Sequence, residues 1–178
     1  MSQSPRRLAT LSALAVLIGS SMPASAQWIA SGRWGTEANW QYVVPGTWLI
    51  LRSDNAAQPV SIHAEGANHV GRIALWCDPQ TQTSTLRFDA YRGLALNPAP
   101  TPEPVTFEID GQNFERTFLY DPAQSVWVAD GALDATFLDA FSWGSRLQLR
   151  NAAGEEITSY RLNGSSRARE ALRQTCQF

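Results

Sequence analysis

The sequence predicts a β-rich α+β domain: an antiparallel, sandwich-like sheet with two short helices. Three observations lead to this prediction. Short segments rich in Val, Ile, Leu and aromatic residues recur along the chain, as in strands. Several of them alternate apolar with polar residues, which is the period of a strand with one buried face. Only two segments have helical spacing, and the second ends in a cysteine that can tie it to the sheet.

Residues 1–26 have the order of a secretory signal peptide. Two arginines precede the apolar run 11–18 (LSALAVLI), and a small-residue cleavage triplet ends at Ala26. The run is too short to span a bilayer, although an N-terminal membrane anchor is the alternative. We therefore expect cleavage after Ala26 and one mature β-rich domain, residues 27–178, in the periplasm or secreted.

The expected mature chain is mildly acidic. Without the two signal arginines it has 12 arginines against 16 acidic residues, a formal charge of −4, and no lysine. It has no basic cluster, which argues against nucleic acid and anionic membranes as partners. It also has no second apolar stretch of membrane-spanning length, so we expect no integral membrane segment after cleavage.

The first expected strands lie in the first half of the mature chain. The strand 83–91 alternates, with Leu86 and Phe88 on one face and Arg87 on the other. The remaining segments are apolar runs rich in Val, Ile, Leu and Trp: 47–52, 59–63 and 70–77. Prolines then punctuate residues 96–104, which we expect to form a short extended linker or loop.

A hairpin is expected after this loop. Apolar and polar residues alternate over 105–109, Asp110-Gly111 supplies a turn, and the return strand places aromatic residues on one face. Those aromatic residues are Phe114, Phe118 and Tyr120. Further strands are expected at 125–129, around Leu147 and Leu149, and over 158–162.

The first helix is expected from about Ala132 to Ser142. Asp130 is its predicted N-cap, Asp134 its first-turn acid, and Gly144 suits its C′ position. Its apolar face carries Leu133, Phe137, Ala140 and Phe141.

The second helix follows an expected N-cap at Ser165 or Ser166. Its inward stripe is Ala168, Ala171, Leu172, Thr175 and Cys176. In an oxidising compartment Cys176 is expected to join Cys77, which staples this helix to the sheet. The model of chain entropy assigns such a loop roughly 4–5 kcal/mol. The alternative is a redox-active pair, but redox pairs favour C-x-x-C spacing.

The region from Cys77 to Cys176 resembles known envelope proteins. The order of an apolar strand with a cysteine, the VTFEIDG hairpin, the VWVAD strand, the GSRLQLR strand and the YRLNGSSRAREALRQTC ending looks like type VI secretion-associated proteins of the VasI/TagO type. The ending is also similar to the invasion-associated locus B family. Both resemblances imply an exported bacterial accessory protein and no catalytic residues.

No motif for catalysis or metal binding is present. There is no G-x-S-x-G elbow and no S-x-x-K. His63 and His69 are the only histidines, and their spacing matches no zinc motif, so we expect ordinary surface or turn histidines. We predict no enzyme activity, no metal and no cofactor.

The best binding candidates are tryptophans near the start of the mature chain. Trp28, Trp34, Trp40 and Trp48 cluster there, and Arg33 is placed to stack on a neighbouring ring. These side chains form either a ligand surface or a lid over one sheet face. We expect an accessory protein of the cell envelope that acts by non-catalytic protein–protein contact, associated with secretion or host interaction. The alternative is a glycan- or peptidoglycan-binding module that uses the Trp cluster.

Overall fold

The computed structural model describes residues 32–34, 41–43, 46–52, 55, 57–90 and 96–177. The strands in this part are β1 (Gly32–Trp34), β2 (Gln41–Val43), β3 (Leu49–Leu51), β4 (Val60–Glu65), β5 (Gly71–Asp78), β6 (Thr83–Ala90), β7 (Glu103–Ile109), β8 (Gln112–Asp121), β9 (Val126–Asp130), β10 (Arg146–Arg150) and β11 (Glu156–Arg161). The helices are α1 (Ala135–Trp143) and α2 (Ser165–Arg173). The predicted β-rich fold with two short helices is confirmed.

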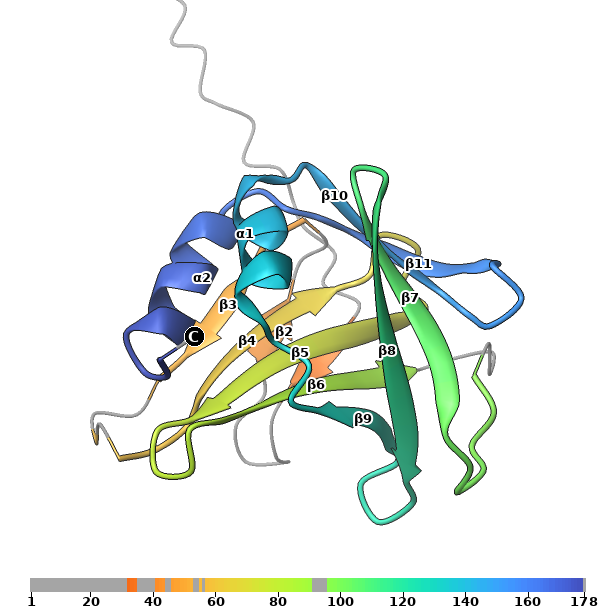
Figure 1. The fold of residues 1–178 in the computed structure, drawn as a ribbon, viewed down its shortest axis with the longest axis horizontal. Helices are drawn as coiled ribbons and strands as arrows, with labels where there is room; N and C mark the ends of the chain where they lie inside the picture. The colour runs from red at the N-terminus through yellow and green to blue at the C-terminus, as the bar shows by residue number, and fades with distance from the viewer. Residues whose placement is uncertain are drawn as a thin grey trace, which may run out of the picture.

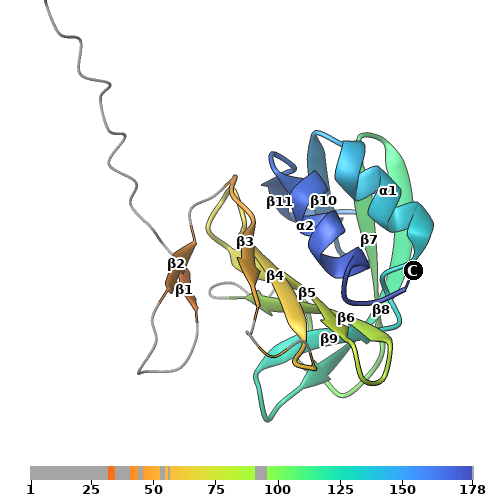
Figure 2. The same cartoon turned by 90° about the vertical axis from the view of Figure 1, so that its left-hand side faces the viewer.

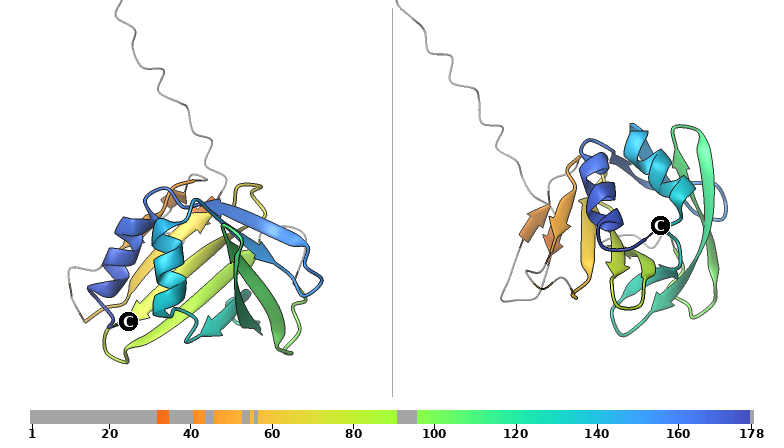
Figure 3. Two further views of the ribbon diagram at one scale, coloured as in Figure 1. Left: turned by 45° about the horizontal axis from the view of Figure 1, so that its top comes forward. Right: turned by 60° about the vertical axis from the view of Figure 1, so that its left-hand side comes forward.

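Nine strands form one antiparallel sheet in the order β11-β10-β7-β8-β9-β6-β5-β4-β3, and β1 pairs with β2 separately. The sheet coils strongly, and the two helices lie side by side over its open side (Figures 1 and 3). One half of the sheet, β3 to β6 with β9, therefore faces the other half, β7, β8, β10 and β11, across a shared interior (Figure 2).

Hydrogen bonds connect the β4–β5 turn to β11 at the far edge of the sheet. The Ala67 N–H donates to the Ser159 carbonyl at 2.8 Å, and the Asn68 side-chain amide donates to the Ile157 carbonyl at 2.9 Å. These bonds join residues about 90 positions apart along the chain. The coiled sheet thus approaches a closed barrel at this end, which limits the exposure of its edges.

The hydrophobic core fills the interior. Strand alternation sends every second side chain inward, and on β5 these are Ile73, Leu75 and Cys77, all fully buried. Aromatic rings from several elements meet edge to face in this core. The ring of Phe107 on β7 lies 6.0 Å from Phe118 and 5.9 Å from Phe137, between ring centroids.

The ends of α1 differ from the prediction. Asp134 is the N-cap, because its side chain accepts a hydrogen bond from the Phe137 N–H at 2.8 Å. The predicted cap, Asp130, is instead the last residue of β9, and it accepts a bond from the Thr85 hydroxyl. Gly144 is the C-cap with an extended backbone and not a left-handed one. A Cβ at this position would meet the Ile109 side chain at 2.5 Å, so close packing explains the glycine.

The start of α2 also differs from the prediction. Gly164 is the N-cap, with a left-handed φ of 84°, and neither Ser165 nor Ser166 caps the helix. Ser165 is the first helical residue, and its buried hydroxyl donates to the Leu162 carbonyl at 2.7 Å. The predicted inward stripe is confirmed, since its small and apolar members are buried: Ala168, Ala171, Leu172 and Cys176.

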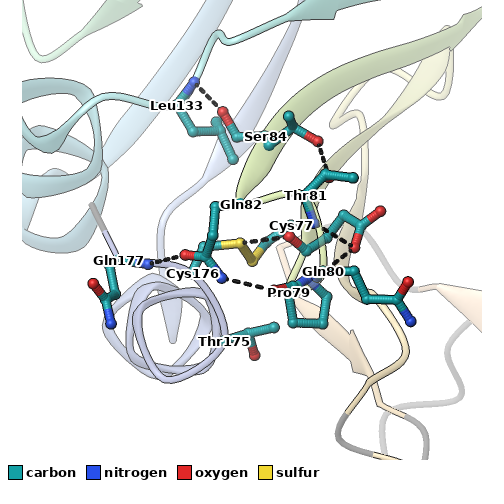
Figure 4. Close-up of a disulfide and its surroundings, with 12 residues drawn as sticks. Cys77, Pro79, Gln80, Thr81, Gln82, Ser84, Leu133, Thr175, Cys176 and Gln177 are labelled. Atoms are coloured by element: carbon teal, nitrogen blue, oxygen red, sulfur yellow. Dashed lines mark hydrogen bonds between the residues drawn. A yellow bond between two sulfur atoms is a disulfide. The ribbon is translucent and has the colours of Figure 1, made fainter.

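The predicted disulfide is present. Cys77 of β5 and Cys176, just beyond α2, are bonded across a sequence separation of 99 residues (Figure 4). Both cysteines are almost fully buried. Beside them the Gln177 N–H donates to the side-chain oxygen of Gln82 at 3.0 Å, so the β5–β6 turn also holds the end of the chain.

Candidate functional site

A groove lies on the outer face of the sheet half formed by β3 to β6 and β9. The residues that alternate with the core residues of β5, namely Arg72, Ala74 and Trp76, face this side. Figure 2 shows the helices on one side of these strands and the β1–β2 hairpin on the other. The groove has a volume of about 350 Å³ and is lined by Leu51, Ser61, His63, Arg72, Ala74, Trp76, Arg87, Asp89, Gln124 and Val126.

Arg87 lies over Trp76 in this groove. Arg87 pairs with Ala74 across the β5–β6 ladder, which places it diagonal to the tryptophan on the same face. Its guanidinium carbon is 4.6 Å from the centroid of the ring, a cation–π contact. Its Nη1 donates to the side-chain oxygen of Gln124 at 3.1 Å, and Gln124 in turn donates to Asp121 at 2.7 Å. The guanidinium is therefore held from two sides.

The two arginines of the groove differ in their partners. Arg72 donates to the carboxylate of Asp89 through Nε at 2.9 Å, and its Nη2 lies 2.7 Å from the same oxygen. Arg87 forms no salt bridge with any described residue, and its buried Nε has no hydrogen-bond acceptor there. Asp89 compensates the charge of Arg72, whereas the charge of Arg87 has no carboxylate partner among the described residues.

His63 lies at the floor of the groove, and the expectation of a surface or turn histidine is wrong for it. It sits within β4, is 4% exposed, and its Nε2 is 2.7 Å from the Ser61 hydroxyl. Burial, together with the charges of Arg72 and Arg87, lowers the pKa of His63 to about 3. The ring is therefore neutral at physiological pH. His69 lies beyond the end of β4 in the turn to β5, with a half-exposed side chain, as predicted.

Ser61 and His63 have the spacing of a nucleophile and its base, but not the chemistry. A general base is most effective when its pKa lies near the operating pH, and a histidine with a pKa of about 3 holds a proton poorly. Both side chains are also at least 95% buried. The contact is therefore better explained as satisfaction of two buried polar groups.

Metal binding has no support in the described part of the chain, because no three His, Cys, Asp or Glu side chains gather there closely enough to share an ion. Among the same residues, no helix combines the length and apolar character that a membrane crossing requires.

The structure describes only some members of the predicted tryptophan cluster. Trp28 and Trp40 lie outside the described residues. Arg33 and Trp34 belong to β1, in the hairpin whose β2 contacts β4 beside the outer face of the sheet. Their part in binding stays a prediction.

Trp48, the last member of the predicted cluster, has a packing role. It precedes β3, and its Nε1 donates to the Arg161 carbonyl of β11 at 2.9 Å. Its ring meets Phe141 of α1 edge to face, with 4.7 Å between centroids. Trp48 thus bridges the two edges of the coiled sheet beneath the helices, and its predicted part in ligand binding stays a prediction.

Sequence reasoning missed Trp76 and Arg87. A signal was present, because each residue alternates with apolar neighbours of a predicted strand and so had to face away from the core. That the two side chains share one groove depends on strand pairing, which the sequence pattern does not specify.

The comparisons give a fold likeness. No protein-family profile matches the sequence, and no curated protein matches it. A solved structure, the crystal structure of invasion associated protein B from Bartonella henselae, is similar with a TM-score of 0.52 and 17% sequence identity. The match covers 74% of this chain and 94% of that chain. The fold is therefore similar to that of invasion associated protein B, which supports the predicted resemblance to the locus B family. The resemblance to the type VI proteins stays a prediction.

Proposed function

We propose that this protein is an exported accessory protein of the bacterial cell envelope that acts by protein–protein contact through the outer-face groove. The observation that carries the proposal is the Trp76–Arg87 pair, a half-buried aromatic ring and a half-buried cation outside the core. Tryptophan and arginine are the residues most enriched among the energetic anchors of protein interfaces. A groove that presents both is suited to a partner side chain.

Two further observations support the proposal. The Cys77–Cys176 disulfide is typical of proteins that fold outside the cytoplasm, in agreement with the predicted signal peptide. The similar fold belongs to invasion associated protein B, which fits a role in host interaction.

The proposed function involves no catalysis, and the Ser61–His63 pair allows a direct test of this point. A fluorophosphonate probe, which labels activated serines, should leave Ser61 unmodified because His63 is a poor base. Labelling that Ser61→Ala abolishes would replace the accessory role by a hydrolase.

The glycan-binding alternative rests on the N-terminal tryptophans and on no described side-chain contact. In the groove itself, the guanidinium of Arg87 covers one face of the Trp76 ring, and a sugar would need such a face for stacking. Protein contact is therefore the better-supported role for this surface.

The test is a cross-linked pull-down of tagged mature protein from its native envelope. The protein carries Trp76→Ala or, as the matched control, Trp143→Ala. Trp143 ends α1 and is 83% exposed, so its loss also removes a surface tryptophan. We expect Trp76→Ala to lose the captured partner and Trp143→Ala to keep it. Capture that survives Trp76→Ala, or that fails only with Trp143→Ala, would refute the assignment of the groove.

A further inference from the structure

We propose that the groove recognises a carboxylate, carried by an Asp or Glu side chain of the partner protein, with Arg87 as its receptor. This inference rests on the proposed function and specifies its chemistry. It assigns a ligand class to a site whose residues no sequence motif pointed to.

Charge is the first argument. Arg72 is neutralised by Asp89, and His63 is uncharged, so Arg87 supplies the net positive charge among the residues that line the groove. Arg87 is half buried and has no carboxylate partner among the described residues, so it has lost hydration that no charged group in this part of the chain replaces. A ligand carboxylate compensates that loss, because charge-assisted hydrogen bonds to arginine are among the strongest in proteins.

Preorganisation is the second argument. The guanidinium carbon lies over the Trp76 ring at 4.6 Å from its centroid, and Gln124 accepts from Nη1 at 3.1 Å. Gln124 is itself fixed by Asp121, which also accepts bonds from the Ala123 and Gln124 backbone N–H groups in the β8–β9 turn. The donors that remain on Arg87 are therefore oriented before a ligand arrives, which lowers the entropic cost of binding. Gln124 is a positioning residue in this scheme.

The walls of the groove favour a peptide segment over a sugar acid. Leu51, Ala74 and Val126 add apolar surface beside the charged centre. A carboxylate next to an apolar side chain matches this lining, and such neighbours are common in an extended peptide. A sugar acid has a carboxylate but would place hydroxyl groups against these apolar side chains, which costs free energy.

The experiment compares two acetylated and amidated tetrapeptides, Ala-Glu-Leu-Ala and Ala-Gln-Leu-Ala, which differ only in the charged group. Each is titrated to about 10 mM against the mature protein, and the side-chain N–H signals of Trp76 and Arg87 are followed by NMR. We expect the Glu peptide to shift both signals and to bind about tenfold more tightly than the Gln peptide.

Matched variants locate the effect. Arg87→Gln should abolish the preference for Glu, and Gln124→Ala should weaken it while leaving the peptides able to bind. Arg146→Gln, which removes a surface arginine of β10 that pairs with Glu156, should leave the preference unchanged. The inference is overturned if neither peptide shifts these signals, if both bind alike, or if the preference survives Arg87→Gln. Tighter binding of galacturonic acid than of the Glu peptide would overturn the choice of a protein segment.

The result also separates this inference from the proposed function. Loss of partner capture in Trp76→Ala together with equal binding of the two peptides would retain protein contact and remove carboxylate recognition. A clear Glu preference together with unchanged capture in Trp76→Ala would retain the anion site and remove the groove as the partner surface.

Discussion

The two faces of β5 and β6 differ in kind although they share the same strands. On the inner face, Ile73, Leu75 and Phe88 are fully buried among apolar side chains. On the outer face, one position away along each strand, Trp76 and Arg87 form a partly exposed contact in a groove. Strand alternation with a period of two residues is sufficient to separate the two chemistries.

This difference separates the residues that stabilise the fold from those available for binding. Inner-face side chains contribute hydrophobic free energy and fill a close-packed interior, so they have little freedom to vary. The outer face carries polar and charged groups whose arrangement is not needed to fill the core. Substitutions on the inner face should therefore lower stability. Substitutions on the outer face should weaken partner contact and change stability little.

The largest expected effect is the difference in stability between substitutions at two neighbouring residues of β6, Phe88 and Arg87. Phe88→Ala should lower the free energy of unfolding by about 3–5 kcal/mol, because it leaves a cavity in the core. Arg87→Gln should change it by less than about 1 kcal/mol, because it removes a half-buried charge without a carboxylate partner in the described chain. Urea denaturation of both variants measures the contrast. Equal losses in the free energy of unfolding would show that the outer-face residues also stabilise the fold.

The disulfide provides the next comparison. Replacing both Cys77 and Cys176 with Ala should cost about 2–5 kcal/mol, because the crosslink restricts the unfolded chain. The bond lies on the inner side of β5, so the NMR signal of the Trp76 indole N–H should be unchanged in the folded variant. A shift of this signal would mean that the end of α2 also shapes the groove.

His63 tests whether an outer-face residue can affect stability when it is buried. Its folded pKa is about 3, whereas an unfolded histidine titrates near 6.5. Between these values the unfolded chain binds a proton that the folded protein does not, so stability falls as the pH drops from about 6.5 towards 3. The expected slope is about 1 kcal/mol per pH unit, with no contribution above pH 6.5.

The control for this pH dependence is His63→Gln, which keeps a polar side chain beside Ser61 and cannot be protonated. The difference between wild-type and variant unfolding free energies should shrink or change sign as the pH falls from 7 to 4. Parallel stability curves over this range would show that the folded histidine is protonated as easily as an unfolded one.

The smallest expected effect concerns the cap of α1, the helix that covers the inner face. Asp134→Ala should lower stability by about 1 kcal/mol, because the Phe137 N–H loses its acceptor. Asp134→Asn keeps an acceptor and should cost less. Asp130→Ala is the matched control from β9, and thermal melting of the three variants ranks them. A larger loss with Asp130→Ala would contradict the observed start of the helix.

The inner face was largely predictable from sequence, because its information is local. Alternation in 83–90 and 105–109, the Asp110-Gly111 turn and the stripe ending at Cys176 all appear in the structure as expected. The exact helix ends were not predictable. Asp130 and Asp134 are equally good caps by residue type, and Ser165 is a better cap by type than Gly164, which the structure uses, so residue type alone does not select the helix ends.

The groove could not be predicted, because it depends on pairing between distant segments. Trp76, Arg87 and Gln124 come from β5, β6 and the β8–β9 turn, and only the sheet order brings them together. The burial of His63 was missed for a related reason. It was expected at the surface or in a turn because its spacing to His69 matches no zinc motif, whereas its environment is set by side chains from adjacent strands.

The central claim is that the outer face of β5 and β6 is the contact surface. Hydroxyl-radical footprinting of residues 27–178, purified and in the cells that produce the protein, tests this claim without any substitution. We predict that oxidation of Trp76 is suppressed in the cells while Trp143, exposed at the end of α1, reacts equally in both samples. Unchanged oxidation of Trp76, or protection confined to Trp143, would contradict the account.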